Sequence, residues 1–226
     1  MITAQDLQAM LAHMPPLSPV LGQANAAQGA LAPLCGWLQS YPKPSALRRP
    51  RVVVFAAADD AALHALKSPD ATLNKLCLAA NADLRAYDLG DALLGHVAQA
   101  FTYGLLALED GVDVLLPYVT LSSAHMAVQL QQALTANPST NAFELLQANG
   151  SVSMAAMCGA MVAARMAQVP VLIDDATGHV ATQWLQALHQ NAANHVFNLS
   201  THNPLGVVRP AAEQGLLLLP LLRGLR

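Results

Sequence analysis

Two adjacent acids end an apolar run in this sequence. The stretch from Val169 to Gly178 reads VPVLIDDATG, so that Asp174 and Asp175 directly follow five apolar or ring residues. A carboxylate buried without a partner is costly, so both acids are expected where the buried run reaches the surface. Other apolar runs end in the same way, and the candidate ligand-binding residues at these ends are Asp88, Ser122, Ser123, Asp174, Thr201 and His202. These residues predict one crevice lined by acids and hydroxyl groups.

A possible phosphate-binding turn begins the segment NGSVSMAAMCGAMVAARM. Gly150 and Ser151 open a helix there that consists mostly of small residues. The first turn of a helix offers N–H groups without partners and the positive end of its dipole, which together suit a phosphate. The alternative is an ordinary N-cap on a tightly packed core helix, and such caps are the commoner case.

The turn TLSSAH also carries hydroxyl groups between a strand-like run and a helix-like run. Ser122 and Ser123 could hold a phosphate or a ribose, or they could cap the helix that follows. The turn lacks the glycines of a P-loop or a GxGxxG motif, so nucleotide binding of those two kinds is not predicted.

Glu213 is the candidate general base. It stands in RPAAEQGLLLLPLL, just before an apolar run, and a carboxylate near a dry site can have a raised pKa. The alternative is a glutamate in the first turn of a helix, where it is favoured by the helix dipole. The eight histidines and three cysteines show no metal-ligand spacing and no CxxC pair, so neither a metal nor a cofactor is expected.

The elements that would position these residues alternate along the chain. Short apolar runs, rich in valine, leucine and isoleucine, are separated by segments of helical length such as 91–108 and 122–136. The five strand-like runs are RVVVFAAADD, ADLRAYDLG, VDVLLPYVTLSS, VPVLIDDATG and NHVFNLSTHN. This order predicts a three-layer, doubly wound α/β fold with a mostly parallel sheet of five or more strands. In such a sheet the polar ends of the runs share one edge.

Composition favours a single α/β domain over residues 1–226. We expect residues 1–45 to be helical and to pack with the C-terminal helix as a small subdomain. The chain is 54% hydrophobic and 11% charged, against about 25% charged in ordinary domains. So little charge is available to cover the surface that a homodimer is expected.

Several functional classes are not predicted by the sequence. The formal charge is −3 and the basic run RRPR stands isolated at 48–51, so nucleic acid is not an expected partner. No membrane span is expected, because the long uncharged stretch is interrupted by Arg165 and Pro170. The N-terminus has no secretory pattern and the cysteines are unpaired in sequence, which predicts a cytoplasmic protein.

Taken in order, the motifs resemble those of the nicotinate-nucleotide:dimethylbenzimidazole phosphoribosyltransferases, which prepare the lower ligand of cobalamin. The specific match is FELLQANGSVSMAAMCGAMVAARMAQVPVLIDDATGHVATQWLQAL, and VVVFAAADD, SPDAT, AYDLG and STHN match loosely. The resemblance implies the family's α/β fold and the transfer of phosphoribose from nicotinate mononucleotide to a benzimidazole-type base. It also implies phosphate contacts at Gly150 and Ser151 and substrate contacts at Asp88 and Asp174.

The sequence departs from the family pattern at positions that would contact the substrates or take part in catalysis. The glycine-rich loop of the family is PYVTLSSAH here, and the helix glutamate is Ser153. Two C-terminal registers are possible: one ends the chain before the family's catalytic glutamate, and the preferred one places Glu213 one position from it. The chain is also shorter than the family's usual length.

Three hypotheses follow from this pattern. The first is a divergent but active phosphoribosyltransferase with Glu213 as base. The second is a non-catalytic paralogue that binds a nucleotide or an aromatic base, or that pairs with a true enzyme. The third is an unrelated α/β protein, because fold alone does not fix function. We expect the fold and the dimer to be retained and the activity to be weak or lost.

Overall fold

The five apolar runs form one parallel sheet in the computed structural model of the chain. The structure describes residues 2–16, 34, 36–37, 47–57, 60–90, 96–108, 111–120, 124–173, 175–199 and 213–224. The strands are β1 (Pro50–Ala56), β2 (Asp83–Asp88), β3 (Val114–Val119), β4 (Val171–Ile173) and β5 (Val196–Asn198). Their spatial order is β2-β1-β3-β4-β5, and every neighbouring pair is parallel. The predicted fold class is therefore confirmed.

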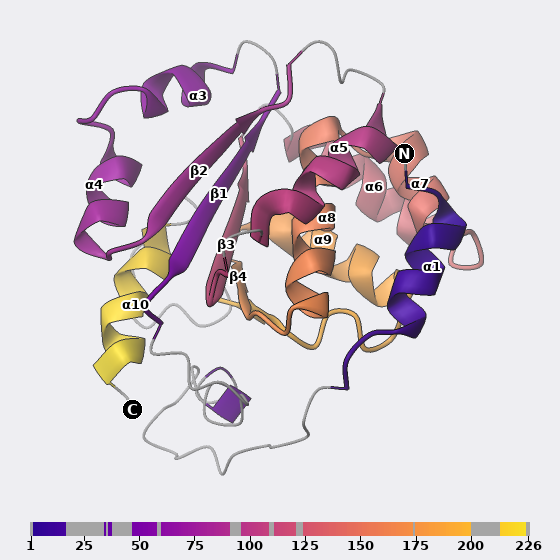
Figure 1. Ribbon diagram of the computed structural model, residues 1–226. Coiled ribbons are helices and arrows are strands. Elements are labelled where there is room, and N and C mark those ends of the chain that lie inside the picture. The colour runs from indigo at the N-terminus through magenta and orange to yellow at the C-terminus, as the bar shows by residue number, and fades with distance from the viewer. Residues whose placement is uncertain are drawn as a thin grey trace.

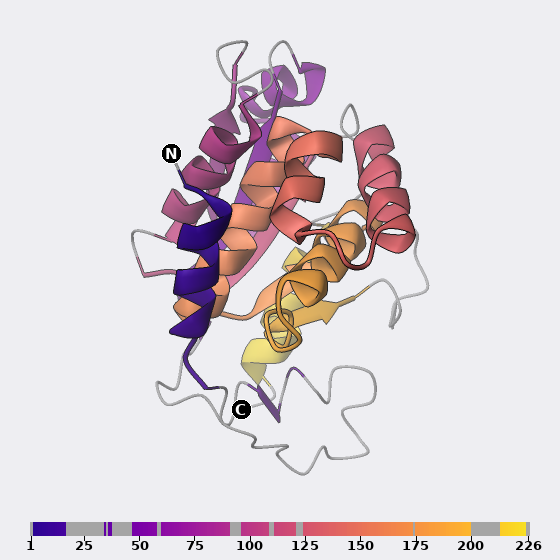
Figure 2. The same ribbon diagram turned by 90° about the vertical axis from the view of Figure 1, so that its right-hand side faces the viewer.

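Helices cover both faces of this sheet (Figure 1). The helices are α1 (Ala4–Ala12), α3 (Ala61–Leu66), α4 (Thr72–Ala79), α5 (Val97–Leu105), α6 (Ala124–Ala136), α7 (Ala142–Asn149), α8 (Val152–Met166), α9 (Ala176–Leu188) and α10 (Glu213–Gly224). A short 3-10 helix, Leu106–Leu108, follows α5. Figure 2 shows the layer that contains α1 and α5–α9, while α3, α4 and α10 lie across the sheet in Figure 1.

Alternate residues of the central strand belong to the two halves of the core. Val53 and Phe55 of β1 pack with α5 and α8, whereas Val52 and Val54 pack with α4 and α10. A strand whose two faces are both buried needs apolar residues at every position, and all seven residues of β1 are buried. This explains why the strands appear in the sequence as continuous apolar runs.

The first and last described helices lie on opposite faces of the sheet. Leu7 and Leu11 of α1 join the cluster around α5 and α8, while Leu216 of α10 joins the other cluster together with Leu34. The start of α1 has a capping box: the Thr3 N–H donates to Asp6 Oδ2 at 2.8 Å, and the Asp6 N–H donates to Thr3 Oγ1 at 3.1 Å. Most of residues 17–46 lie outside the described residues, so the subdomain of residues 1–45 with α10 stays a prediction.

No helix within the described ranges is both long enough and apolar enough to cross a membrane.

Candidate functional site

The carboxyl ends of the five strands share one edge of the sheet. After β1 the chain crosses to the face of α4, and after β3 it crosses to the opposite face, where α6, α7 and α8 lie. The ends of β1 and β3 are neighbours, so the crossovers diverge between them and form a topological switch point. Open α/β sheets bind their ligands in the crevice at such a point. We call this edge of the sheet, with the turns that follow its strands, the carboxyl edge.

Helix α8 begins at the carboxyl edge. Its last residue, Met166, lies five positions before the start of β4, so this end of the helix lies at the opposite edge. The helix has 15 residues and is therefore about 22 Å long, close to the length of a strand of six or seven residues. Ser151 caps the helix, and its Oγ accepts the Met154 N–H at 3.1 Å. The helix N-terminus that the sequence predicted as a phosphate site is therefore close to the switch point.

Hydrogen bonds within the turn decide which donors a ligand could use. The Gly150 N–H donates to the carbonyl oxygen of Leu146 at 2.8 Å and so ends α7. The first-turn N–H groups of Val152 and Ser153 have no acceptor within the helix, as at any helix start. Ser153 is completely buried, so a phosphate at this turn would rest on the Val152 N–H, with the Gly150 N–H used inside the protein.

The small residues of α8 bring it into close contact with α5. A Cβ atom at Gly104 would overlap the carbonyl oxygen of Ala156, and one at Gly159 would overlap the carbonyl oxygen of Phe101. Only glycine allows the two helix backbones to approach this closely. This contact, together with the fully buried Met154 and Met157, fixes the position of the α8 N-terminus.

A second helix, α9, also begins at the carboxyl edge. Asp175 is its N-cap and accepts the Gly178 N–H at 2.6 Å. Burial raises the pKa of this carboxyl group, and the hydrogen bond from Gly178 opposes the rise. Asp175, the second of the two adjacent acids, therefore serves as a helix cap. Its neighbour Asp174 lies outside the described residues.

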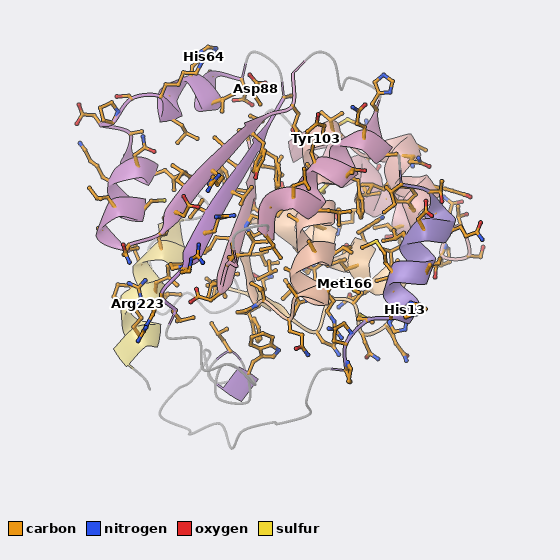
Figure 3. The ribbon with its side chains drawn as sticks, viewed as in Figure 1. His13, His64, Asp88, Tyr103, Met166 and Arg223 are labelled. Atoms are coloured by element: carbon orange, nitrogen blue, oxygen red, sulfur yellow. The ribbon has the colours of Figure 1, made fainter. Side chains whose placement is uncertain are left out.

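Asp88 lies beside a cavity of about 420 Å³ at the end of β2. Its Oδ1 accepts the Gly90 N–H at 3.0 Å, and Gly90 has a φ of 55°, which favours glycine. Tyr87 lines the same cavity and stacks on Phe55 with ring centroids 5.5 Å apart. On the α5 side the lining residues are Gln99 and Tyr103. Figure 3 labels Asp88 and Tyr103 toward the same end of the molecule.

Two tyrosines beside a carboxylate could hold a flat, partly polar ring. Aromatic side chains offer ring faces for stacking, and ligand pockets combine apolar walls with a few polar groups. Tyr87, Gln99 and Tyr103 were not predicted from the sequence. The available signal was weak: a tyrosine directly before the strand-end Asp88, and a tyrosine exposed on a helix that is otherwise buried on one face.

The predicted site residues fall into three groups. Asp88 lies at the carboxyl edge, as its place at a strand end predicts, and Gly150 and Ser151 lie at the same edge; the substrate contacts of all three stay predictions. Ser122, Ser123, Asp174, Thr201 and His202 lie outside the described residues. Glu213 begins α10, but its side chain is not among those described.

Helix α10 is held near the other edge of the sheet at its C-terminal end. Arg223 in its last turn donates to the carbonyl oxygen of Leu47 from Nε at 3.0 Å and from Nη2 at 2.8 Å. Leu47 precedes β1 by three residues, so this end of α10 lies by the start of β1. The role of Glu213 as base stays a prediction.

Other reactive side chains are buried inside the core. Cys77 and Cys158 are free and buried; burial raises the pKa of the Cys77 thiol to about 12 and raises that of Cys158 as well. Thiols with raised pKa values are poor nucleophiles at neutral pH. Among the described side chains, no group of three histidines, cysteines or acids could hold a metal ion.

Comparison with known proteins finds one matching sequence family and several solved structures with a similar fold. A family model described as "Phosphoribosyltransferase" matches residues 121–215, a range that includes α8, β4, α9 and β5. No curated protein sequence matches the chain.

Two solved structures share the fold over almost the whole chain. One is nicotinate-nucleotide-dimethylbenzimidazole phosphoribosyltransferase from Thermus thermophilus, with a TM-score of 0.64 and 16% identity, over 97% of this chain and 94% of that chain. The other is CobT from the same organism, with a TM-score of 0.70 and 15% identity, over the same 97% and 94%. The resemblance predicted from the motifs is confirmed: it is a likeness of fold over the chain and of sequence over residues 121–215.

Proposed function

We propose that this chain binds a mononucleotide and a flat aromatic base at the carboxyl edge, and that its phosphoribosyl transfer is weak or lost. The ligands we propose are nicotinate mononucleotide and a benzimidazole-type base, the substrates implied by the family. The observation that carries the proposal is the α8 N-terminus at the switch point of the sheet, on the same edge as the Asp88 cavity.

Each part of such a ligand pair has a counterpart at this edge. The N–H group of Val152, with the positive end of the α8 dipole, suits the 5′-phosphate. The cavity between Tyr87 and Tyr103 has a suitable size and lining for the flat base. In the transfer reaction a ring nitrogen of the base attacks the anomeric carbon, nicotinate leaves, and a carboxylate takes the proton of the azole.

The proton acceptor is the weak part of this site. Asp88 and Asp175 already accept the backbone N–H groups of Gly90 and Gly178, so each carboxylate has a structural role in its own turn. Glu213 is the candidate base, and the far end of its helix is held beside Leu47. Loss of a well-placed general base lowers the rate by about 10²–10⁴-fold.

One observation favours the second candidate function, a non-catalytic paralogue that binds ligand or pairs with a true enzyme. Ser153 stands where the family helix has a glutamate, and it is completely buried with no hydrogen-bond partner for its Oγ. The acidic group is therefore replaced by a neutral one at the helix start nearest the switch point. Ligand binding would tolerate the loss of this carboxylate better than the phosphoribosyl transfer reaction would.

We also propose a homodimer in the cytoplasm, with no membrane or nucleic-acid partner. The support for a dimer is the composition, because only 11% of the residues are charged, and Leu106 beside the end of α5 is 43% exposed. Light scattering coupled to gel filtration tests the dimer, and a monomer at micromolar concentration would contradict it.

Isothermal titration with nicotinate mononucleotide and with dimethylbenzimidazole tests the binding proposal. Both ligands are expected to bind the folded chain, and failure of both to bind would leave only the partner role. Nicotinate release then measures turnover, which Glu213→Gln should abolish if Glu213 is the base. Glu144→Gln, a matched change in the first turn of α7, should leave turnover unchanged. Equal turnover in the two variants would remove Glu213 as base.

A further inference from the structure

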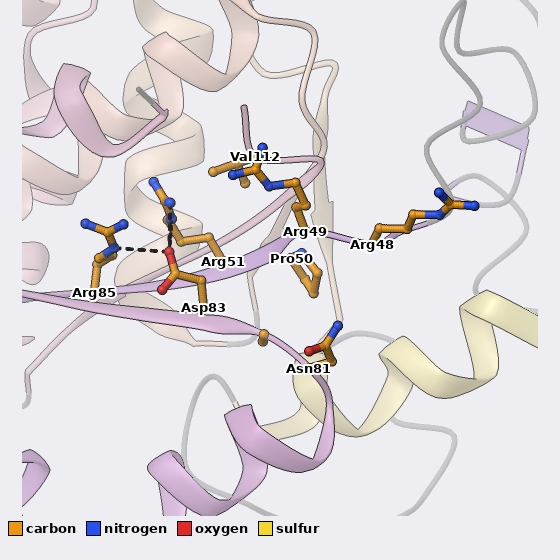
Figure 4. Close-up of a pocket in the computed structure, with 9 residues that line it drawn as sticks. Arg48, Arg49, Pro50, Arg51, Asn81, Asp83, Arg85 and Val112 are labelled. Carbon is orange, nitrogen blue, oxygen red and sulfur yellow. Dashed lines mark hydrogen bonds and ion pairs between the residues drawn. The ribbon is translucent and has the colours of Figure 1, made fainter. Parts of the chain in front are cut away.

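A second pocket lies at the opposite edge of the sheet, where the strands begin. We call it the arginine pocket: a cavity of about 440 Å³ lined by Arg48, Arg49, Arg51, Asn81, Asp83 and Arg85, with three further residues. Figure 4 shows the side chains of Arg49, Arg51 and Arg85 on one side of β1 and β2. The whole chain contains only 11 lysines and arginines and has a formal charge of −3, so four arginines at one pocket are a strong local concentration.

Strand pairing holds two of these arginines in place. Arg51 of β1 pairs in register with Asp83 of β2 and donates to its Oδ2 from Nε at 2.9 Å and from Nη2 at 2.7 Å. Arg51 Nη1 donates to the carbonyl oxygen of Ala107 at 2.8 Å. Arg85, two residues along β2, donates from Nε to the same Asp83 oxygen at 3.0 Å.

Asp83 stays ionised in this arrangement. Partial burial acts to raise its pKa, but the hydrogen bonds from Arg85 and Arg51 outweigh burial and lower it. One carboxylate therefore fixes two guanidinium groups on the floor of the pocket. Fixed groups of this kind lose little freedom when they bind a ligand.

Just before β1, hydrogen bonds hold the backbone of Arg48 and Arg49 but not their side chains. The Asp113 carboxylate accepts the N–H groups of Arg48 at 2.6 Å and of Arg49 at 3.0 Å. Within the described part of the chain, neither the Arg48 nor the Arg49 side chain makes a hydrogen bond or an ion pair. The Arg49 guanidinium lies near Gly111, where a Cβ atom would be 3.5 Å from Nη1.

The charges at this pocket do not balance. Arg51 and Arg85 are paired with Asp83, whereas the guanidinium groups of Arg48 and Arg49 have no carboxylate partner among the described side chains, so the positive charge of these two is not neutralised by an ion pair. Like charges held together repel one another, and a bound polyanion removes that repulsion. The planar fork of arginine matches phosphate geometry, and the cavity is within the usual size range for small-molecule sites.

We propose that the arginine pocket binds a small phosphorylated molecule that carries two or more negative charges. This site is separate from the carboxyl edge, because β1 has seven residues and so spans about 20 Å between the two edges. A small ligand fits better than a nucleic acid, since the arginines line a cavity and the chain as a whole has a formal charge of −3.

Calorimetric titration of the full chain with pyrophosphate tests the proposal. The double variant Arg48→Gln/Arg49→Gln should weaken pyrophosphate binding by about tenfold or more, because it removes two charge-assisted donors. The matched control is Lys67→Gln/Lys75→Gln, which removes two charges that do not line the pocket. Lys75 forms only an exposed ion pair with Asp70, so this control should change binding by less than about twofold. Thermal unfolding followed by circular dichroism shows whether each variant is folded.

Further titrations distinguish a phosphate site from a general anion site and from a nucleic-acid surface. Nicotinate mononucleotide carries a single phosphate group, and any binding of it at the carboxyl edge should persist in the arginine variant, whether or not that edge is catalytic. Citrate, a polyanion without phosphorus, should bind more weakly than pyrophosphate. The proposal is overturned if the arginine variant keeps full pyrophosphate affinity, or if citrate binds equally well. Tighter binding of a DNA oligonucleotide than of pyrophosphate would also overturn it.

Discussion

The two edges of the sheet are prepared for anions by different means. At the carboxyl edge the donors are backbone N–H groups at the starts of α8 and α9, each start capped by a side chain, Ser151 or Asp175. At the amino edge, where the strands begin, the donors are the guanidinium groups of the arginine pocket. Helix N-termini follow from the α/β topology and accompany the fold, whereas a cluster of arginines depends on particular residues of this sequence. The donors of the carboxyl edge therefore accompany the fold, whereas those of the amino edge depend on individual side chains.

The variant Gly159→Val should have the largest effect and should separate the two edges. A side chain at position 159 collides with the backbone of Phe101, so α8 must move away from α5. We expect the free energy of unfolding to fall by about 3 kcal/mol or more. Denaturant unfolding measures the loss, and titrations should show weaker nucleotide binding with pyrophosphate binding retained.

The control for this variant is Val128→Ala, at a position on α6 that is 52% exposed. It should change stability by no more than about 0.5 kcal/mol. An equal loss of binding at both edges in Gly159→Val would mean that the edges are coupled through α8 and do not bind anions independently.

Acid should destabilise the protein through His195, which immediately precedes β5 on the amino side of the sheet. This side chain is fully buried beside the Met161 carbonyl oxygen, 2.9 Å from Nε2. Burial, with a smaller contribution from Arg165, lowers the pKa of His195 to about 3, against 6.5 in the unfolded chain. Between these values the unfolded chain binds one more proton, so stability is complete above pH 6.5 and falls as the pH decreases toward 3.

Thermal or denaturant unfolding at pH 7 and pH 5 measures this dependence. The slope attributable to one proton is about 1.4 kcal/mol per pH unit. His195→Gln retains an N–H donor for the Met161 carbonyl but cannot titrate, so its stability should depend less on pH in this window. The same pH dependence in the variant and the unchanged chain would assign the acid sensitivity to other groups.

Asp83→Asn tests the amino edge by removing one charge. The variant weakens the anchoring of Arg51, whose side chain is only 5% exposed, and should cost about 1–2 kcal/mol of stability. It also removes a negative charge from the arginine pocket, so pyrophosphate should bind a few-fold more tightly.

Asp70→Asn is the matched control, because Asp70 forms an ion pair that is exposed on both sides. It should change stability and binding little. Weaker pyrophosphate binding in Asp83→Asn would show that Asp83 acts by placing Arg51 and Arg85, and that its charge is secondary.

Ser151→Ala tests the carboxyl edge and should have the smallest effect on stability. Loss of the N-cap of α8 should cost about 1 kcal/mol and should weaken nucleotide binding at this helix start. Thr3→Ala removes the N-cap of α1 and should cost about as much stability, with no effect on binding. Equal nucleotide affinity in the two variants would place the phosphate away from α8.

The fold could be predicted from the sequence because its signals are local. Five apolar runs separated by helical segments indicate a parallel sheet covered on both faces, and the spacing of Thr3 and Asp6 indicates a helix start. The position of Asp88 follows from the same rule, since parallel strands end together, whereas Gly150 and Ser151 reach that edge through the packing of α7 and α8. The tyrosine cavity could not be predicted, because it joins β2 to α5 through side-chain packing.

The sequence by itself determined the elements, their direction and the edge at which the polar strand ends meet. Only the tertiary structure decided how these groups are used: Asp175 caps α9, and the Gly150 N–H donates to the Leu146 carbonyl oxygen at the end of α7. It also joined the run RRPR, isolated in sequence, to Asp83 and Arg85, which follow Arg51 by more than 30 positions. The pattern of apolar residues that predicts a strand or a helix can be read from residues close together in the sequence. The arginine pocket instead depends on which residues face each other across β1 and β2, and that register exists only after the strands have paired.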